Sequence, residues 1–242
     1  MRRIHMPIRG IAVAACAVAL ATSCVAAEVS ALSIESGGRP LAVTRYAAAG
    51  TAARPGVMVL HGASGLDAGH EAYAHYARLL AANGIDAYLV DYFGPRATWT
   101  CGCWSIWAAK VLDVAAFVAR SPQSSGRVGV LGFSLGGGVA IESAADPRIR
   151  ALAVLYPSIP NKVEFARPPP LLVLQGDADR AAPLSDSEAL VRLARQSGGR
   201  AELVVYPGEG HRLSTWQQAA ATDATERMIA FFRAELTAPS GR

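Results

Sequence analysis

Short apolar runs alternate along the chain with stretches in which apolar residues recur at helical spacing. The runs are mostly bounded by glycine or proline, which favours strands. We expect strands at residues 29–36, 40–48, 56–62, 85–92, 126–133, 150–157, 170–177 and 201–208, and helices at residues 69–84, 104–120, 135–145, 184–198 and 217–236. Continuously apolar strands separated by helices are typical of a parallel sheet covered on both faces. The pattern therefore predicts an α/β fold, a three-layer α/β/α sandwich with a mostly parallel central sheet of about eight strands.

The N-terminal segment differs from the rest of the chain. The first nine residues carry three arginines and no acidic residue, and residues 11–27 are uncharged and end in Val-Ala-Ala. This pattern predicts a secretory signal peptide over residues 1–27, cleaved after Ala27, and hence a periplasmic or secreted protein with one domain at residues 28–242. Two alternatives stay open: a retained membrane anchor, for which the run is short and rich in alanine, and a lipoprotein modified at Cys24.

Charge limits the classes of partner. The chain of 242 residues has 23 basic and 19 acidic residues, but three of the basic ones belong to the predicted signal, which leaves 20 against 19. A balanced domain gives no electrostatic reason to expect nucleic acid or an anionic membrane surface as a partner. With 52% hydrophobic residues the chain can bury a sizeable core, and we expect no membrane span after signal removal.

Signal removal leaves two of the four cysteines, Cys101 and Cys103, in the sequence Trp-Thr-Cys-Gly-Cys-Trp. A bridge between them would close a very small ring. A free pair packed beside the tryptophans, a labile disulfide and an intermolecular link are the alternatives, and we favour the packed pair. A single Cys-x-Cys is a weak zinc signal because structural zinc takes four ligands, so we expect no metal.

Ser134 lies in the sequence Gly-Phe-Ser-Leu-Gly, directly after an expected strand and directly before an expected helix. A strand, Gly-x-Ser-x-Gly and a helix in that order form a nucleophile elbow, in which the serine takes a strained backbone conformation and its hydroxyl projects above the sheet. Gly132 and Gly136 are required there because a Cβ atom would strike the neighbouring strand or helix. Gly137 and Gly138 are not part of the motif, and taken alone they favour a flexible loop.

A serine hydroxyl is a poor nucleophile until a base takes its proton, and an acid must orient that base. On this architecture the acid and the histidine follow the serine in that order, each on a loop after a strand. Asp177 and Asp179 follow the seventh expected strand, and His211 follows the eighth. We assign the acid to Asp179, since Asp177 directly follows Gly176 and suits a turn. Ser134, Asp179 and His211 are the predicted catalytic triad.

The third expected strand ends in a glycine-rich turn, Val-Leu-His-Gly-Ala-Ser-Gly-Leu at residues 59–66. In this architecture such a loop supplies one backbone N–H to the developing oxyanion, and the residue after the nucleophile supplies the second. We assign these two donors to Ala63 and Leu135. His61 then shapes the loop and is not the base.

These motifs resemble the dienelactone hydrolase family of α/β-hydrolases. The resemblance covers about residues 55–235 and is carried by residues 57–66, 84–94, 126–140, 171–183 and 206–213. It implies the α/β-hydrolase fold, with Ser134 at the nucleophile position, Asp179 at the acid of the Gly-x-x-Asp loop and His211 at the base. The name-giving enzymes of the family use a cysteine nucleophile and a glutamate in the oxyanion loop, where this chain has Ser134 and Gly62. This difference indicates a broader esterase.

Access to the site is expected to be shallow or open. In such folds a cap domain is most often inserted after the sixth strand, where this chain has only 13 residues, 157–169, so we expect none. The aromatic-rich segment after the fourth expected strand is the candidate wall, with Tyr92, Phe93, Trp99 and Trp104 lining it and Arg96 available to hold a substrate carboxylate. The alternative is that these aromatic residues only cover the core.

The leading hypothesis is a serine hydrolase that cleaves carboxylic esters or lactones through an acyl-enzyme, with a small-molecule substrate and no cofactor. One alternative is a peptidase of the prolyl-oligopeptidase kind, although no stretch of the chain is long enough for the propeller domain of that family. The other is a non-catalytic ligand-binding member of the fold, although all three triad residues are present. We make no prediction of the oligomeric state.

Overall fold

The computed structural model describes residues 27–93 and 103–237. The predicted signal segment up to residue 26, Arg96, Trp99 and Cys101 lie outside the described residues, and the expectations for them stay predictions. The strands are β1 (Glu28–Ser36), β2 (Arg39–Ala47), β3 (Arg54–Leu60), β4 (Asp86–Val90), β5 (Ser124–Phe133), β6 (Ile149–Leu155), β7 (Leu171–Gly176) and β8 (Ala201–Tyr206). The helices are α1 (His70–Ala82), α2 (Trp104–Arg120), α3 (Leu135–Ser143), α4 (Leu184–Gln196) and α5 (Gln218–Thr237), with short 3-10 turns η1 (Asp67–Gly69) and η3 (Leu213–Thr215).

The eight strands form one sheet in the order β1-β2-β4-β3-β5-β6-β7-β8. The pairs β1–β2 and β2–β4 are antiparallel, and every pair from β4–β3 through β7–β8 is parallel. The expected mostly parallel sheet is therefore confirmed. The carboxyl ends of β3, β5, β7 and β8 lie at the same edge of the sheet, which is where parallel α/β sheets carry their sites.

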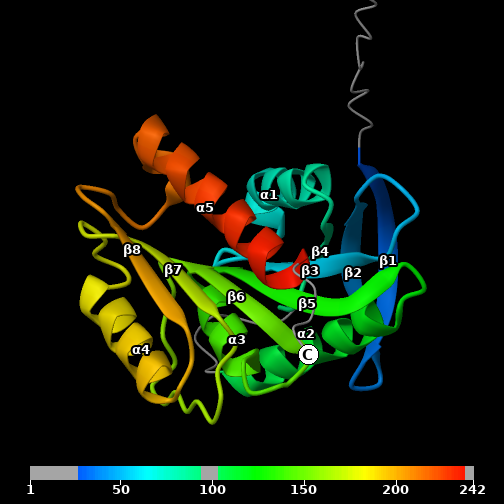
Figure 1. Cartoon of the computed structure of the whole chain (residues 1–242), viewed down its shortest axis with the longest axis horizontal. Coiled ribbons are helices and arrows are strands. Elements are labelled where there is room, and N and C mark those ends of the chain that lie inside the picture. The colour runs from blue at the N-terminus through cyan, green and yellow to red at the C-terminus, as the bar shows by residue number, and fades with distance from the viewer. Residues whose placement is uncertain (1–26, 94–102, 238–242) are drawn as a thin grey trace, which may run out of the picture.

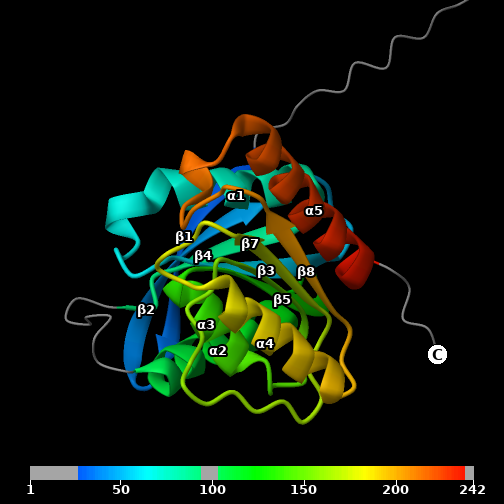
Figure 2. The same ribbon diagram turned by 90° about the vertical axis from the view of Figure 1, so that its left-hand side faces the viewer.

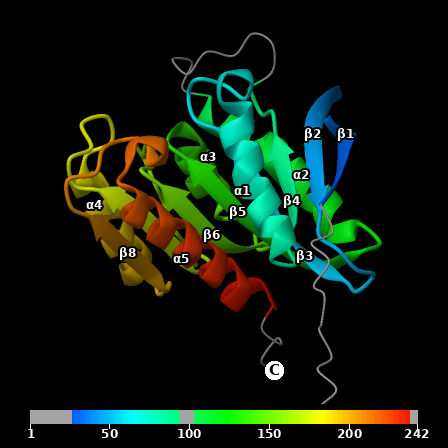
Figure 3. The same ribbon diagram turned by 90° about the horizontal axis from the view of Figure 1, so that it is seen from above.

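Helices cover both faces of the sheet, because the central strands are apolar on both sides. Figure 1 shows α1 and α5 on one face and α2, α3 and α4 on the other, and Figure 2 shows the same three layers from the side. Seen from the first face, α1 and α5 lie over the sheet, roughly along the direction of the strands (Figure 3). Leu80, Met228 and Phe232 fill the core on that face, while Val111 and Val139 contribute to the core on the other. The predicted three-layer sandwich is confirmed.

The connection between β6 and β7 contains no helix or strand. It runs through residues 156–170 and includes prolines 168–170, which disfavour regular structure. No cap domain is inserted at this point of the described chain, as expected from the length of the segment.

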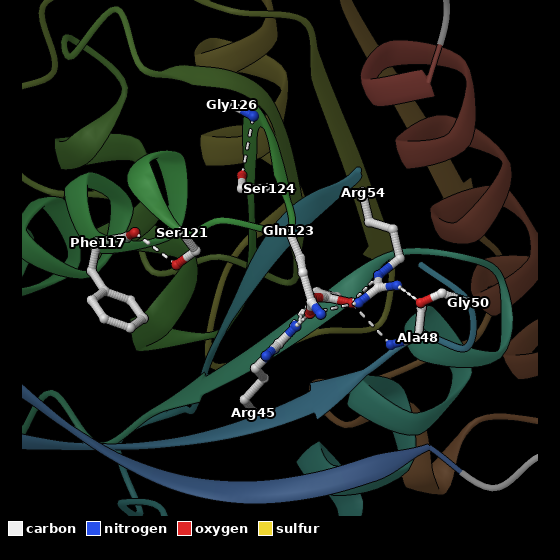
Figure 4. Close-up of polar contacts among 10 residues, drawn as sticks. Arg45, Ala48, Gly50, Arg54, Phe117, Ser121, Gln123, Ser124 and Gly126 are labelled. Atoms are coloured by element: carbon white, nitrogen blue, oxygen red, sulfur yellow. Dashed lines mark hydrogen bonds and ion pairs between the residues drawn. The ribbon is translucent and has the colours of Figure 1, made fainter. Parts of the chain in front are cut away.

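A buried ion-pair network ties the antiparallel and parallel parts of the sheet together. Asp86, at the start of β4, is 4% exposed and accepts hydrogen bonds from Arg45 Nη2 at 2.5 Å, Arg54 Nε at 2.8 Å and the Ala48 amide at 2.9 Å. Gln123 Oε1 accepts from both guanidinium groups, at 3.0 and 3.2 Å. Figure 4 shows Arg45, Arg54 and Gln123 pointing toward one another. This network joins β2, β3 and β4 at the end of the sheet where the parallel strands begin, away from their carboxyl ends.

Candidate active site

Ser134 lies between β5 and α3 with a backbone φ of 52° and ψ of −116°. A positive φ is strained for a residue with a Cβ atom, and such strain persists only where the surroundings impose it. Gly132 and Gly136 make the turn possible: a Cβ on Gly132 would lie 2.3 Å from the Gly136 carbonyl oxygen, and one on Gly136 would lie 2.5 Å from that of Leu60. The predicted elbow and the reason for its glycines are confirmed.

The glycines that follow the motif are closely packed. A Cβ on Gly137 would lie 2.7 Å from Pro157 Cβ, and one on Gly138 would lie 2.3 Å from both the Trp104 ring and the Ser158 carbonyl oxygen. Both residues belong to α3, so the flexible loop that they favour in isolation is wrong. The same contact places half-buried Trp104 against α3 at Gly138, where it also packs on the core.

The three residues of the predicted triad lie in one chain of hydrogen bonds. Ser134 Oγ is 2.8 Å from His211 Nε2, and His211 Nδ1 is 2.8 Å from Asp179 Oδ2. His211 follows β8 and Asp179 follows β7, so the two loops meet above the elbow. The His211 side chain is 25% exposed and the Asp179 side chain is fully buried. Asp177 instead accepts a hydrogen bond from the Gly208 amide at 2.6 Å, in keeping with its assignment to a turn.

Asp179 is held by four donors. The amides of Ala181 and Ala182 donate to Oδ1 at 2.8 and 2.9 Å, and Gln175 Nε2 joins His211 on Oδ2, at 3.1 Å. Gln175 is fully buried in β7, and Ser187 Oγ on α4 donates to its Oε1 at 3.0 Å. The sequence analysis missed Gln175. The signal was a single polar residue inside the apolar run Leu-Leu-Val-Leu-Gln-Gly.

The loop after β3 lies beside the elbow. Within the described residues, neither the Ala63 amide nor the Leu135 amide donates to another group, so both N–H groups remain available. Leu135 is the first residue of α3, where backbone N–H groups favour negative charge. The Gly62 carbonyl accepts from the Gly65 amide at 3.1 Å and lies 2.8 Å from His61 Nδ1. The two predicted oxyanion donors thus lie on segments that flank Ser134.

His61 and Tyr92 are both fully buried beneath this loop. Their rings stack with centroids 4.1 Å apart, and the Tyr92 hydroxyl donates to the His61 carbonyl at 2.5 Å. Burial lowers the pKa of His61, which keeps the imidazole neutral at pH 7, while its bond to Gly62 and nearby Asp91 and Asp67 act in the opposite direction. His61 therefore shapes the loop, as expected. The assignment of Tyr92 to a substrate-contacting wall is wrong, because its ring turns inward onto His61.

Cys103 is disulfide-bonded, and its partner lies outside the described residues. The free packed pair that we favoured is therefore wrong, although Cys103 does pack against the core together with Trp104. Among the described residues, no group of three or more His, Cys, Asp or Glu side chains is arranged to hold a metal ion. No helix in the described ranges is both long and apolar enough to cross a membrane.

A strained serine at the end of a central parallel strand, with an acid and a histidine on the loops after β7 and β8, defines the α/β-hydrolase fold class. The chain belongs to the dienelactone hydrolase family, whose sequence pattern matches residues 43–236.

Individual relatives are distant. A Salmonella typhimurium protein provisionally named carboxymethylenebutenolidase is 26% identical over 141 residues, which cover 51% of this chain and 52% of that protein. The chain thus spans about half the length of the curated relatives that it matches.

Two solved structures share the fold. A Klebsiella pneumoniae protein provisionally described as a dienelactone hydrolase has a TM-score of 0.75 at 22% identity, covering 86% of this chain and 99% of that one. An esterase from Pyrobaculum calidifontis has a TM-score of 0.70 at 18% identity, covering 88% and 86%.

Proposed function

We propose that this protein is a serine hydrolase that cleaves carboxylic esters or lactones. The observation that carries the proposal is the hydrogen-bonded chain from Ser134 Oγ through His211 to buried Asp179, with each heavy-atom distance at 2.8 Å. A nucleophile and base within hydrogen-bond reach, with the base oriented by a third group, is the arrangement that activates a serine hydroxyl. The membership of the dienelactone hydrolase family supports the same class of reaction.

The reaction proceeds in two halves. His211 Nε2 takes the proton of Ser134 Oγ as that oxygen attacks the ester carbonyl, and Asp179 stabilises the imidazolium. The Ala63 and Leu135 amides donate to the oxyanion. Collapse of the tetrahedral intermediate breaks the bond to the alkoxy oxygen, which leaves with the proton from His211. Water then attacks the acyl-enzyme, again through His211, and releases the acid and free serine.

The surroundings of the site favour a small ester or lactone. The described connection between β6 and β7 carries no cap over it, and half-buried Trp104, which packs against Gly138 one turn after Ser134, offers an apolar side chain for the wall. Gly62 leaves the oxyanion loop without a side chain at the position where the family's name-giving enzymes carry glutamate. The names of the compared proteins, a carboxymethylenebutenolidase and an esterase, belong to the same chemical class.

A fluorophosphonate probe tests the nucleophile directly. We expect the wild type to be labelled and Ser134→Ala to remain unlabelled. Initial rates on p-nitrophenyl esters of increasing chain length and on a panel of small lactones then define the substrate. If the labelled protein leaves every ester and lactone intact and cleaves proline-containing peptides, it is a peptidase. If the wild type is not labelled, the hydrolase proposal fails and a non-catalytic ligand-binding protein is favoured.

The two aspartates after β7 provide a matched pair for the acid. Asp179→Asn removes the charge beside His211 and disfavours the correct tautomer, so we expect kcat to fall about 10³–10⁴-fold. Asp177→Asn alters a carboxylate that accepts a hydrogen bond from the Gly208 amide and lies outside the triad, and we expect kcat to stay near that of the wild type. Equal effects of the two substitutions would contradict the assignment of Asp179.

We also propose that the protein is exported and cleaved after Ala27. In support, β1 begins at Glu28, directly after the predicted cleavage site, so the folded domain would keep all its described strands. Mass spectrometry of the mature protein is expected to find Glu28 at the N-terminus. A lipidated Cys24 or an intact leader would overturn this proposal.

A further inference from the structure

The amide of Gly62 donates a hydrogen bond to the Tyr73 hydroxyl at 2.9 Å. Tyr73 lies in the first turn of α1, eleven positions further along the chain, and its side chain is half-buried. The bond therefore links the loop after β3 to a helix that covers the sheet. Among the described residues, the Tyr73 hydroxyl is the partner found for this amide.

Gly62 separates two peptide groups, and each is fixed by different contacts. The peptide before it has its carbonyl, on His61, bound by Tyr92 and its N–H bound by Tyr73. The peptide after it has its carbonyl, on Gly62, bound by the Gly65 amide. In a planar trans peptide the N–H points opposite to the carbonyl. The direction of the Ala63 N–H therefore depends on the φ and ψ angles of Gly62, which no Cβ atom restricts, so the hydrogen bonds to the two peptides must hold them.

The Tyr73 hydroxyl and the nucleophile lie on the same side of Gly62. A Cβ atom on Gly62 would be 3.3 Å from the Tyr73 hydroxyl oxygen and 3.5 Å from Ser134 Cβ. The first separation is tighter than ordinary van der Waals contact and the second is ordinary. The phenol oxygen therefore fills the space into which any side chain at position 62 would extend.

The ring of Tyr73 is anchored to the elbow itself. Its centroid lies 5.4 Å from that of Phe133, the residue that precedes Ser134. Tyr76, one turn along α1, packs on the same Phe133 ring at 5.0 Å, but no hydrogen bond of its hydroxyl to a described residue is found. Burial raises the pKa of Tyr73, so the phenol stays protonated near neutral pH and the neutral oxygen accepts the Gly62 N–H.

We propose that Tyr73 is a positioning residue of the active site. Its hydroxyl holds the Gly62 amide, and its ring holds Phe133, so that the residue fixes the separation between the oxyanion loop and Ser134. It acts on the transition state through the Ala63 N–H and does not touch the substrate. This inference rests on the proposed hydrolase function.

The test compares Tyr73→Phe with Tyr76→Phe, since each removes one hydroxyl from a ring packed on Phe133. An oxyanion donor that is slightly misplaced weakens binding of the transition state more than binding of the substrate. For Tyr73→Phe we expect kcat to fall about tenfold with KM changed less than twofold. The pH profile should keep its shape, because the substitution does not touch His211. For Tyr76→Phe we expect wild-type kcat and KM.

Gly62→Ala supplies an independent readout. Its added Cβ presses on the Tyr73 hydroxyl, so we expect a similar loss of kcat in the wild-type background. In the Tyr73→Phe background the hydroxyl is gone, and the same change should cost less than threefold further. A smaller loss of kcat in the second background shows that the two positions share a contact, whereas the losses of two independent substitutions multiply.

The outcomes separate this inference from the proposed function. If the wild type neither reacts with the fluorophosphonate probe nor cleaves any ester or lactone, the proposed function fails. If the wild type is active and Tyr73→Phe matches Tyr76→Phe in kcat, the positioning role is overturned. The positioning role is also overturned if Tyr73→Phe lowers kcat only as far as a lower melting temperature lowers the amount of folded protein. The same holds if the loss of kcat in the double variant equals the product of the losses in Tyr73→Phe and Gly62→Ala.

Discussion

Gln175 and His211 approach the same oxygen of Asp179. Gln175 Nε2 is 3.1 Å from Asp179 Oδ2, and His211 Nδ1 is 2.8 Å from it. The orientation of the glutamine amide is set from its other end, where Ser187 Oγ donates to Oε1, and by the Ala182 carbonyl, which accepts from Nε2. A flipped amide would place an oxygen against the carboxylate, so these contacts allow one orientation.

Gln175→Met should therefore damage both stability and activity. The replacement has a similar volume but leaves the Ser187 hydroxyl and one site on Asp179 without a partner, in a fully buried position. We expect a loss of about 1–3 kcal/mol in the free energy of unfolding, together with a lower kcat because Asp179 is held less firmly beside His211. Urea unfolding and ester kinetics measure the two effects, and wild-type values in both would show that the contact is dispensable.

Gly132→Ala is expected to prevent the elbow from forming. Its Cβ would lie 2.3 Å from the backbone oxygen of Gly136, and backbone cannot move aside as a side chain can. Gly210→Ala is the matched control, because a Cβ there meets no atom within 4 Å. We expect little soluble folded protein for the first and a wild-type melting temperature for the second. A folded Gly132→Ala variant with normal stability would contradict this account of the turn.

The helices, the strands and the triad could be predicted from the sequence. The helices and strands depend on local hydrophobic patterns, and the triad depends on the order of its residues along the chain. The apolar runs and helical spacing locate the eight strands and five helices of the described residues. Ser134, Asp179 and His211 follow β5, β7 and β8 in the order that the fold requires. Helix boundaries were less accurate: the helix expected at residues 135–145 ends at Ser143, two residues earlier, and Pro147 marks only that a helix must stop before it.

The contacts that orient the triad could not be predicted because they join segments that are distant in sequence. The helical spacing places Tyr73 on one face of α1, but its hydrogen bond to the Gly62 amide depends on how α1 packs on the sheet. Tyr92 follows a strand end, where a ring can face the solvent or turn inward, and here the stacking partner His61 decides the direction. Gln175 was visible only as a polar residue in a buried strand, with no indication of its partner.

Asp86→Ala should destabilise the fold without altering the site. It removes the acceptor of Arg45 Nη2 and Arg54 Nε, and Arg54 is only 7% exposed, so a buried cation is left unpaired. Breaking such a pair by removing one partner costs about 3–5 kcal/mol. Chemical denaturation measures this, with Glu164→Gln as the control, because the pair of Glu164 with Lys162 is fully exposed and should contribute nothing measurable. Equal stabilities of the two variants would contradict the role of the network.

His61 should make the stability of the protein depend on pH. Burial lowers its pKa in the folded state below the ordinary value of 6.5, so between these two values the unfolded chain binds more protons than the folded one. The free energy of unfolding therefore rises with pH through this window and falls as the pH drops below about 6.5. The stability that neutral His61 contributes is fully present above the pKa of His61 in the unfolded chain, and it is lost as the pH falls toward the pKa of His61 in the folded protein.

His61→Gln removes this titration while keeping a polar side chain beside the Gly62 carbonyl. We expect the wild type to lose more stability than the variant when the pH is lowered from about 7.5 to about 5, as measured by urea unfolding at constant ionic strength. The variant is also expected to lose kcat at all pH values, because His61 Nδ1 helps to fix the carbonyl that sets the direction of the Ala63 N–H. Parallel stability curves for the two proteins would show that His61 has the same affinity for a proton in the folded and unfolded states.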